Sequence, residues 1–259
     1  TMVDTRGPLR MGRFAIQDFH DYGAQMSVEQ VFVRSSNIGT ARLAQMIGPE
    51  RQRDFLASLG FLEPLSLQLP EAARARPQQP ERWGELSSMT ISYGHGLSLT
   101  PMHLAAGYAA LVNGGTLVEP TLTRRTDTTP GPRVISEETS RIMRSLFRSV
   151  VTDGTASLGE VAGYGVGGKT GTADKPNPDG GYYEDRVVAT FAGAFPMNDP
   201  RYVIVVTMDE PQETSGPVAR RTAGWTVVPV AAEMVRRVAP VLGMRPQDPA
   251  VIEAGVRLR

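Results

Sequence analysis

Hydrophobic positions in the first half of the chain recur three and four residues apart, which is typical of amphipathic helices. Ser27 and Gln30 have the spacing of a capping box and predict a short helix that begins there. A second helix is expected after Asn37, with Gly48 as its end, and a third over residues 49–59. This part of the chain is therefore predicted to be helical.

Three further helices are predicted downstream. Thr100 and Pro101 provide an N-cap and a first-turn proline for one of them. Ser136 begins the next, and two glutamates follow it in the first turn, where the helix dipole favours them. The last spans about 223–239, and Pro229 is expected to kink this helix or to mark its true start.

Other segments lack a helical pattern. Residues 1–26 read as irregular chain with short extended pieces, and residues 62–86, rich in Pro, Gln, Arg and Glu, read as a surface excursion. The glycine-rich stretch 91–96 is expected to form a turn or a short strand.

The character of the chain changes after residue 165. A short glycine-rich strand is predicted over 166–173, and continuous apolar runs at 187–195 and 202–208 indicate buried strands joined by a tight connection. Helices thus come first, then an antiparallel sheet, then a closing helix. We expect one α+β domain over residues 1–259, with helices packed on an antiparallel sheet.

Composition narrows the function classes. The 259 residues are 41% hydrophobic, which suffices for a sizeable core, and 27 basic residues balance 27 acidic ones, so we expect no nucleic-acid partner. The chain has no cysteine, and its three histidines are scattered, so neither a metal site nor a cofactor is expected. No apolar run is as long as a membrane span.

The strongest candidate chemistry is Lys169-Thr170-Gly171-Thr172 on the first predicted strand. An ammonium, two hydroxyls and a glycine along a strand edge can recognise an anion, because the amine neutralises a carboxylate and the hydroxyls donate to it. An extended peptide could add to that edge as a further strand. The competing interpretation is a lysine that only protects an edge strand from aggregation.

A second candidate is Ser35-x-Asn37 between two predicted helices. The hydroxyl can relay a proton, and the amide can hold a peptide group. The competing interpretation, helix capping, is the usual role of these residue types. By contrast, Asp209 and Glu210 at the end of a strand are expected to point to opposite faces and not to converge.

S-x-N followed by K-T-G belongs, with an upstream S-x-x-K, to the signature set of penicillin-binding proteins and serine β-lactamases. The chain resembles the class B penicillin-binding proteins, and their division-specific members in particular, over nearly its whole length. The similar segments are Arg10–Phe14 with Asp18, Arg34–Gly39, Tyr93–Gly96 with Leu99–Pro101, and Asn113–Gly115.

The resemblance implies a penicillin-binding, serine β-lactamase-like transpeptidase fold and a role for each motif residue. Ser35 would pass protons, Asn37 would hold the donor peptide's backbone, and Lys169 would support the electrostatics of proton transfer. Thr170 and Thr172, on either side of the glycine, would bind the terminal carboxylate of a D-Ala-D-Ala stem peptide or of a β-lactam. The N–H of Thr172 would also donate to the oxyanion.

The chain departs from this pattern at the nucleophile. Val166 and Thr172 stand three residues before the two lysines, so no S-x-x-K is present, and only 34 residues precede Ser35. We expect the chain to begin after the nucleophile, so that the transpeptidase fold is incomplete at its N-terminal side and this chain alone is inactive. A naturally nucleophile-free relative is the alternative.

Three functions stay open at this point. The first is a D,D-transpeptidase of septal wall synthesis, with stem peptide, β-lactams and divisome proteins as partners. It would work at the periplasmic face of the inner membrane through an anchor outside the chain. The second is a carboxypeptidase or β-lactamase-like hydrolase, and the third is a non-catalytic module that binds peptidoglycan peptide or a divisome protein.

Overall fold

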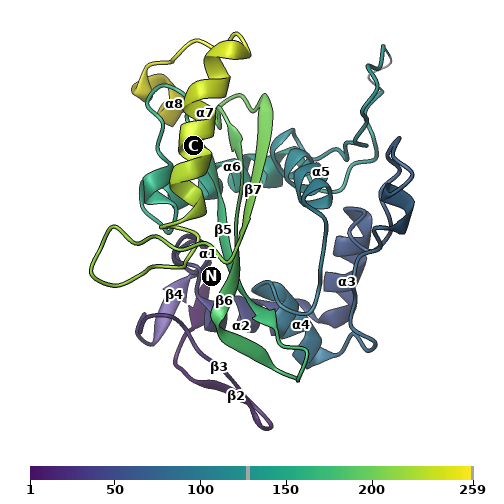
Figure 1. The fold of residues 1–259 in the computed structure, drawn as a ribbon, viewed down its shortest axis with the longest axis vertical. Helices are drawn as coiled ribbons and strands as arrows, with labels where there is room; N and C mark the ends of the chain where they lie inside the picture. Colours follow the sequence, from purple (N-terminus) through teal and green to yellow (C-terminus); the bar gives the residue numbers. More distant parts are fainter. Residues whose placement is uncertain (127–128, 258–259) are drawn as a thin grey trace. The chain divides into compact units, whose positions relative to one another are not determined.

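The computed structural model describes residues 1–126 and 129–257 and has the expected α+β fold. The chain divides into two compact units, and Figure 1 labels their helices and strands. The first unit comprises Thr1–His103 and Glu119–Thr129, and the second comprises Leu104–Val118 and Pro130–Arg259.

The first unit combines four short strands with four helices and a 3₁₀ turn. The strands form two antiparallel pairs, β1 with β4 and β2 with β3. In chain order the elements are β1 (Met2–Asp4), β2 (Leu9–Met11), β3 (Phe14–Ile16), β4 (Gln25–Ser27), α1 (Val28–Arg34), α2 (Asn37–Ile47), α3 (Pro49–Ser58), η1 (Ala72–Arg74) and α4 (Glu85–Ser92).

Local signals set the helix boundaries of the first unit. The capping box predicted for α1 is present: the Ser27 hydroxyl accepts from the Gln30 N–H, and the Gln30 side chain accepts from the Ser27 N–H. Small hydrophobic cores stabilise the described part of the unit. One is formed by Leu9, Ile16, Ile38, Ala41 and Met89, and another by Val3, Met26 and Val31. Strands β1–β4 are therefore anchored to the helices through their alternate, inward-facing residues.

The second unit is built on a three-stranded antiparallel sheet in the order β5-β6-β7. The predicted strands are confirmed, and β6 is longer than expected. Helix α5 (Pro101–Val112) begins in the first unit and ends in the second. The remaining elements are α6 (Glu137–Thr152), η2 (Ser157–Gly159), β5 (Gly167–Pro176), β6 (Tyr182–Phe195), β7 (Tyr202–Asp209), α7 (Val227–Val241) and α8 (Pro249–Val256).

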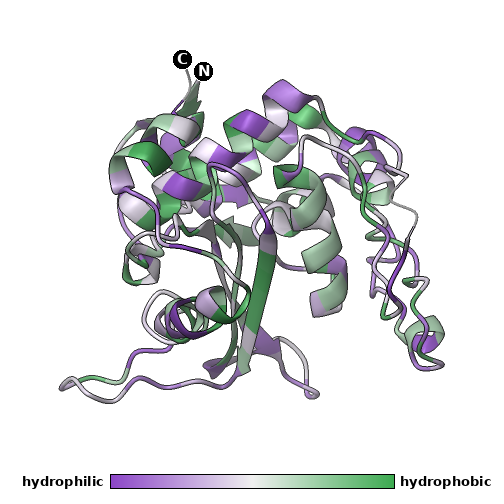
Figure 2. Cartoon of the chain, turned by 90° about the horizontal axis from the view of Figure 1, so that it is seen from above, coloured by the Kyte–Doolittle hydropathy of each residue, from purple (hydrophilic) through white to green (hydrophobic). Residues whose placement is uncertain are grey.

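Helices α6 and α7 pack on the sheet, and α8 packs on α6. The core beside the sheet is well shielded from solvent: Phe191 is fully buried on β6, and Phe147 of α6 and Val227 of α7 are buried as well. In Figure 2 a long strand of the sheet is largely in the hydrophobic colours, and several helices alternate between hydrophobic and hydrophilic colours, which is the pattern of amphipathic helices. The packed sheet therefore supports the side chains along its edge strands.

A buried arginine ties the start of β5 to two other segments. Arg148 of α6 is 7% exposed, and its guanidinium donates to the Val166 carbonyl oxygen at 2.8 Å. The same group contacts the carboxylates of Glu160 at 2.5 Å and of Glu253, on α8, at 2.8 Å. Val166 immediately precedes β5, so this arginine holds the root of the strand against α6 and α8.

Three helices differ from the sequence-based expectations or resolve an open alternative in them. The stretch 91–96 is not a strand: Ile91 and Ser92 end α4, and a turn follows. Pro229 lies in the first turn of α7 and marks its start, where a missing N–H costs no helical bond. Helix α8 was not predicted, although Asp248 caps it and Pro249 is its first residue. Among the described helices, none is long and apolar enough to cross a membrane.

Candidate functional site

The junction between α1 and α2 turns on Ser35. This residue has φ 59° and ψ 47°, the left-handed conformation that caps many helices but that residues other than glycine rarely adopt. Its N–H donates to the Phe32 carbonyl oxygen at 3.3 Å, and the N–H of Ser36 donates to the Val31 carbonyl oxygen at 3.0 Å. The turn holds the half-buried Ser35 at the exact break between the two helices.

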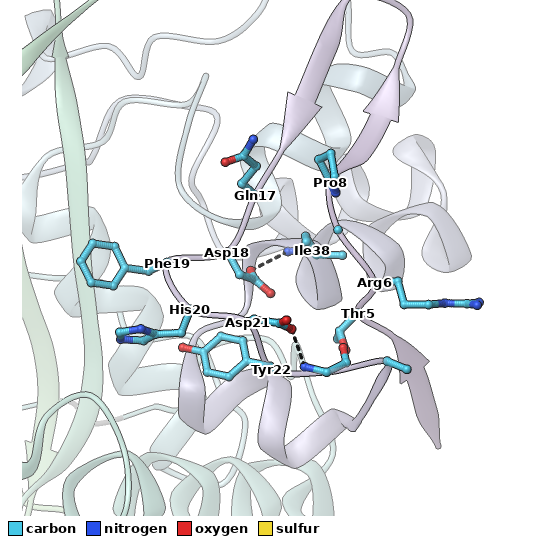
Figure 3. A pocket seen from close by; sticks show the side chains of 13 residues that line it. Thr5, Arg6, Pro8, Gln17, Asp18, Phe19, His20, Asp21, Tyr22 and Ile38 are labelled. Carbon is cyan, nitrogen blue, oxygen red and sulfur yellow. Dashed lines mark hydrogen bonds between the residues drawn. The ribbon is translucent and has the colours of Figure 1, made fainter.

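Ser36 has a purely structural position. It is fully buried and caps α2, because its hydroxyl accepts from the Gly39 N–H at 2.9 Å and donates to the Asp18 carboxylate at 2.6 Å. The other oxygen of Asp18 accepts from the Ile38 N–H at 3.0 Å (Figure 3). The capping interpretation of the Ser-Ser-Asn stretch is thus correct for Ser36, while Ser35 and Asn37 are not the residues that cap α2.

Asn37 is half-buried at the first position of α2, and its side-chain N–H donates to the Gln17 carbonyl oxygen at 3.1 Å. One such bond orients the amide and uses only part of its hydrogen-bonding capacity, which comprises two N–H groups and an oxygen with two lone pairs. The chain segment around Gln17 and Asp18 therefore fixes both Asn37 and the helix N-terminus.

A pocket of about 600 Å³ opens beside this junction, within the first unit. Its lining runs from Thr5 to Pro8 and from Gln17 to Ala24, with Ile38 at one wall (Figure 3). Asp21 in this wall accepts from the Gly23 N–H at 2.8 Å, so its carboxylate shapes the loop. Sequence analysis did not find the pocket, because its walls come from loops without a periodic pattern.

Strand β5 presents the Lys-Thr-Gly-Thr residues on alternating faces of the sheet. In the register with β6, Lys169 lies opposite Ala192, while Thr170 lies opposite Phe191 and Thr172 opposite Ala189. Because successive residues of a strand point to opposite faces, the two threonines share one face and the lysine takes the other. Only β6 pairs with β5 within the described residues, so β5 is an edge strand of this sheet.

The glycines before Lys169 are required by close packing. A Cβ atom at Gly168 would lie 2.5 Å from the Ala192 carbonyl oxygen, and one at Gly167 would lie 2.5 Å from the Met197 side chain. By contrast, Gly171 is exposed, and a Cβ there would meet nothing within 4 Å. The strand is thus packed tightly at its root and has open space beside the Thr-Gly-Thr segment.

Lys169 is half-buried, and its amine donates to the Thr170 carbonyl oxygen at 3.2 Å. Burial lowers the pKa of this amine to about 8, because the charged form loses hydration. Near that pH a substantial fraction of the amine is neutral, so Lys169 can either donate or accept a proton. A lysine amine with its ordinary pKa would stay charged and could only donate.

Each of the two threonines receives support from a loop outside the sheet. The Thr170 hydroxyl lies 2.6 Å from the Thr155 hydroxyl, and the Thr172 hydroxyl accepts from the Ala223 N–H at 2.9 Å. Thr155 follows α6, and Ala223 precedes α7. These two supporting groups were not found from the sequence, since neither stands near the motif along the chain.

One expectation about carboxylates is wrong. Asp209 and Glu210 do converge, because both contact the amine of Lys175, at 2.9 Å and 2.8 Å. Glu210 lies beyond the end of β7 and has φ 51°, so the strict alternation of a strand no longer applies to it. The cluster joins the far end of β5 to the end of β7 and raises the pKa of Lys175 through hydrogen bonds to Glu210 and Asp209.

The predicted site residues fall into two sets. Ser35 and Asn37 lie together at the α1–α2 junction of the first unit, while Lys169 to Thr172 lie on β5 of the second unit. Within the part of the chain that the structure describes, no cluster of three or more His, Cys, Asp or Glu residues has the arrangement of a metal site.

The family model of the penicillin-binding protein transpeptidase domain matches residues 4–225. The chain is 36% identical over 252 residues to a probable peptidoglycan D,D-transpeptidase FtsI of Caulobacter vibrioides, and the match covers 93% of this chain and 42% of that protein. The chain therefore spans less than half the length of this relative.

Solved structures agree with the sequence match. The transpeptidase domain of penicillin-binding protein 3 from Burkholderia pseudomallei is similar with a TM-score of 0.84 and 33% identity, over 96% of this chain and 74% of that one. Penicillin-binding protein 3 from Mycobacterium tuberculosis, solved in complex with ampicillin, is similar with a TM-score of 0.80 and 28% identity, over 96% and 58%. This chain belongs to the penicillin-binding protein transpeptidase family, as a class B member.

Proposed function

We propose that this chain is part of the catalytic domain of a peptidoglycan D,D-transpeptidase, which cross-links stem peptides by serine acyl transfer during septal wall synthesis. The observation that carries the proposal is the Lys-Thr-Gly-Thr segment on an edge strand, with open space at Gly171, in a chain of this family. Both compact units would belong to one transpeptidase domain over residues 1–259. The nucleophile would come from a part of the protein outside this chain.

The substrate is a peptide that ends in D-Ala-D-Ala, or a β-lactam that mimics it. Such a peptide can extend along the free edge of β5, whose outward N–H and C=O groups are available to a further strand. Thr170 and Thr172 donate hydrogen bonds to its terminal carboxylate, and Gly171 between them leaves room for its backbone. The Thr172 N–H is the candidate donor to the oxyanion of the tetrahedral intermediate.

The other motif residues handle the protons and the donor peptide. Attack by the serine nucleophile on the penultimate D-Ala carbonyl releases the terminal D-Ala, whose amine must gain a proton, and the acceptor amine must later lose one. Ser35 passes protons in both steps, and Lys169, whose pKa of about 8 suits proton exchange, supports them. Asn37 holds the donor backbone through its oriented amide.

The decisive experiment is labelling of the full-length protein with a fluorescent penicillin, followed by gel fluorescence and intact mass. We expect a covalent adduct, and we expect Lys169→Ala to slow its formation by roughly 100-fold or more, as loss of a proton-transfer group does. Lys175→Ala is a matched control, because it removes the chain's other lysine from the same strand, where it contacts Asp209 and Glu210. The control should label normally.

Any of three results contradicts the proposal. Normal labelling of Lys169→Ala with an unchanged circular dichroism spectrum would remove the strand lysine from the mechanism. An adduct that the full-length protein hydrolyses within minutes would favour a carboxypeptidase or β-lactamase-like hydrolase, and no adduct at all would favour a non-catalytic peptide-binding module. The 259-residue chain by itself, which contains no S-x-x-K, should form no adduct.

The same reasoning extends to location and partners. We infer that the full-length protein works at the periplasmic face of the inner membrane with divisome proteins, and the similarity to an FtsI protein supports this. A fluorescent fusion of the full-length protein should therefore gather at the division site. An even distribution along the cell envelope would contradict the septal role.

A further inference from the structure

Thr155 contacts Thr170, one of the two threonines of the proposed carboxylate site. Its hydroxyl oxygen is 2.6 Å from that of Thr170, although the residues are 15 apart in the sequence. Both side chains are half-buried, so this hydrogen bond is partly shielded from water. A hydrogen bond of this kind restricts the rotation of both hydroxyl groups.

The neighbouring threonine has the equivalent support from a backbone group. The Ala223 N–H donates to the Thr172 hydroxyl oxygen at 2.9 Å. The two supporting loops are packed together, because a Cβ atom on Gly224 would lie 2.6 Å from the Thr155 carbonyl oxygen. The loops of Thr155 and Ala223 thus pack against each other and hydrogen-bond to the Thr170 and Thr172 hydroxyls.

The direction of these hydrogen bonds decides what the threonines can bind. A hydroxyl has one proton to donate and two lone pairs that accept. The Ala223 N–H can only donate, so it occupies a lone pair of Thr172 and leaves the hydroxyl proton for a ligand. The same arrangement holds for Thr170 when the Thr155 hydroxyl is the donor in their pair.

An acceptor-only ligand selects that arrangement. If a carboxylate lies beside Thr170, the Thr155 hydroxyl donates to Thr170 and the Thr170 hydroxyl donates to the carboxylate. The reverse direction of the Thr155–Thr170 bond would leave the carboxylate without the Thr170 donor. Each donor that already accepts a hydrogen bond is also a stronger donor, because chains of hydrogen bonds polarise one another.

We propose that Thr155 is a positioning residue, which holds the Thr170 hydroxyl as a donor so that Thr170 and Thr172 together select a carboxylate over a neutral group. The inference rests on the proposed function of this strand, and it adds a residue outside the motif that sets the ligand class. Thr155 itself need not touch the ligand.

The test compares three full-length proteins: unaltered, Thr155→Val and Thr155→Ser. Time courses of acylation are recorded at several concentrations of benzylpenicillin and of its methyl ester. They give, for each compound, the dissociation constant of the noncovalent complex and the rate constant of acylation separately. Valine has nearly the shape of threonine without the hydroxyl, and serine retains the hydroxyl. Thermal unfolding of each variant reports whether the fold is kept.

We expect Thr155→Val to weaken benzylpenicillin binding about five- to tenfold, the usual effect of one hydrogen bond between neutral groups, with the acylation rate constant nearly unchanged. Thr155→Ser should restore the affinity. The methyl ester, which lacks the carboxylate, should bind the valine variant and the unaltered protein equally weakly.

If Thr155→Val lost the same factor of affinity for benzylpenicillin and for its methyl ester, Thr155 would have a merely structural role and the inference would be overturned. Full affinity of Thr155→Val for benzylpenicillin would overturn it as well. If the unaltered protein forms no adduct, the proposed function is wrong. The inference is then decided by NMR titration with N-acetyl-D-Ala-D-Ala. It survives only if the peptide shifts the Thr170 and Thr172 amides and binds Thr155→Val more weakly.

Discussion

The α1–α2 junction and strand β5 hold their polar side chains by different means. At the junction, adjacent residues form the turn itself, through a left-handed Ser35 and a helix cap from Ser36, and the carboxylate of Asp18, 18 residues before Ser36, adds to it. On β5 the support comes from outside the strand, through Thr155, Ala223 and the buried Arg148 near the strand root, which lie 15, 51 and 18 residues from their partners along the chain. Side chains at a helix break can be held by near neighbours, whereas a regular edge strand depends on what packs behind it.

The two tryptophans allow this difference to be measured. Trp83 belongs to the first unit and Trp225 to the second, and the chain contains no others. A Trp225→Phe background therefore reports unfolding of the first unit by fluorescence, and a Trp83→Phe background reports that of the second.

The largest effect is expected at the root of β5. Arg148→Met keeps much of the side chain's volume but leaves the buried Val166 carbonyl and two carboxylates without the guanidinium. We expect the free energy of unfolding of the second unit to fall by about 3 kcal/mol, since a buried charged network loses its central member. Urea unfolding followed through Trp225 measures this loss.

The matched control for Arg148 is Arg237→Met on α7, whose exposed guanidinium contacts Glu233 one turn away. An exposed pair of this kind contributes less than about 1 kcal/mol. Equal losses in the two variants would mean that the buried cluster does not hold the strand, and a shift of the Trp83 transition by Arg148→Met would contradict its assignment to the second unit.

A smaller effect is expected at Asp18. Replacing it with alanine removes two hydrogen bonds to a carboxylate, from the Ser36 hydroxyl and the Ile38 N–H, and leaves a fully buried hydroxyl without its acceptor. The free energy of unfolding of the first unit should fall by about 2–3 kcal/mol, as measured by urea unfolding through Trp83.

Asp21→Ala is the control for Asp18→Ala, because Asp21 lines the same pocket and accepts only an exposed bond from the Gly23 N–H. It should cost less than about 1 kcal/mol. If both variants lose the same stability, Asp18 shapes a loop and does not hold the helix junction.

The smallest effect concerns the backbone of Ser35. Neither Ser35→Gly nor Ser35→Ala has the hydroxyl, so the difference between the two variants isolates the cost of the left-handed conformation. We expect the glycine variant to be more stable by about 1 kcal/mol and both variants to acylate poorly in the full-length protein. An alanine variant as stable as the glycine variant would show that the junction carries no such strain.

Much of the local structure was predictable because it depends on neighbours in the sequence. The capping box of α1, the break at Ser35 to Asn37 and the proline at the start of α7 follow from residue types a few positions apart. Helix α8, which was not predicted, carries the same kind of signal in Asp248 and Pro249. The stretch 91–96 does contain the expected turn, but its first two residues end α4, a helix that the glycine enrichment of this stretch does not indicate.

The sequence by itself determined the order and type of most elements, the class of the chain and the residues of the two motifs. The periodic spacing of hydrophobic residues, the helix caps and the turns depend on residues close together in the sequence, and a motif is recognised from its residue types alone. Only the tertiary structure decided that Thr155 and Ala223 stand behind the threonines of β5, that Arg148 is buried at its root, and that Asp209 and Glu210 converge on Lys175. These pairings join residues from distant parts of the chain, and their formation depends on how whole elements pack, which no short stretch of sequence specifies.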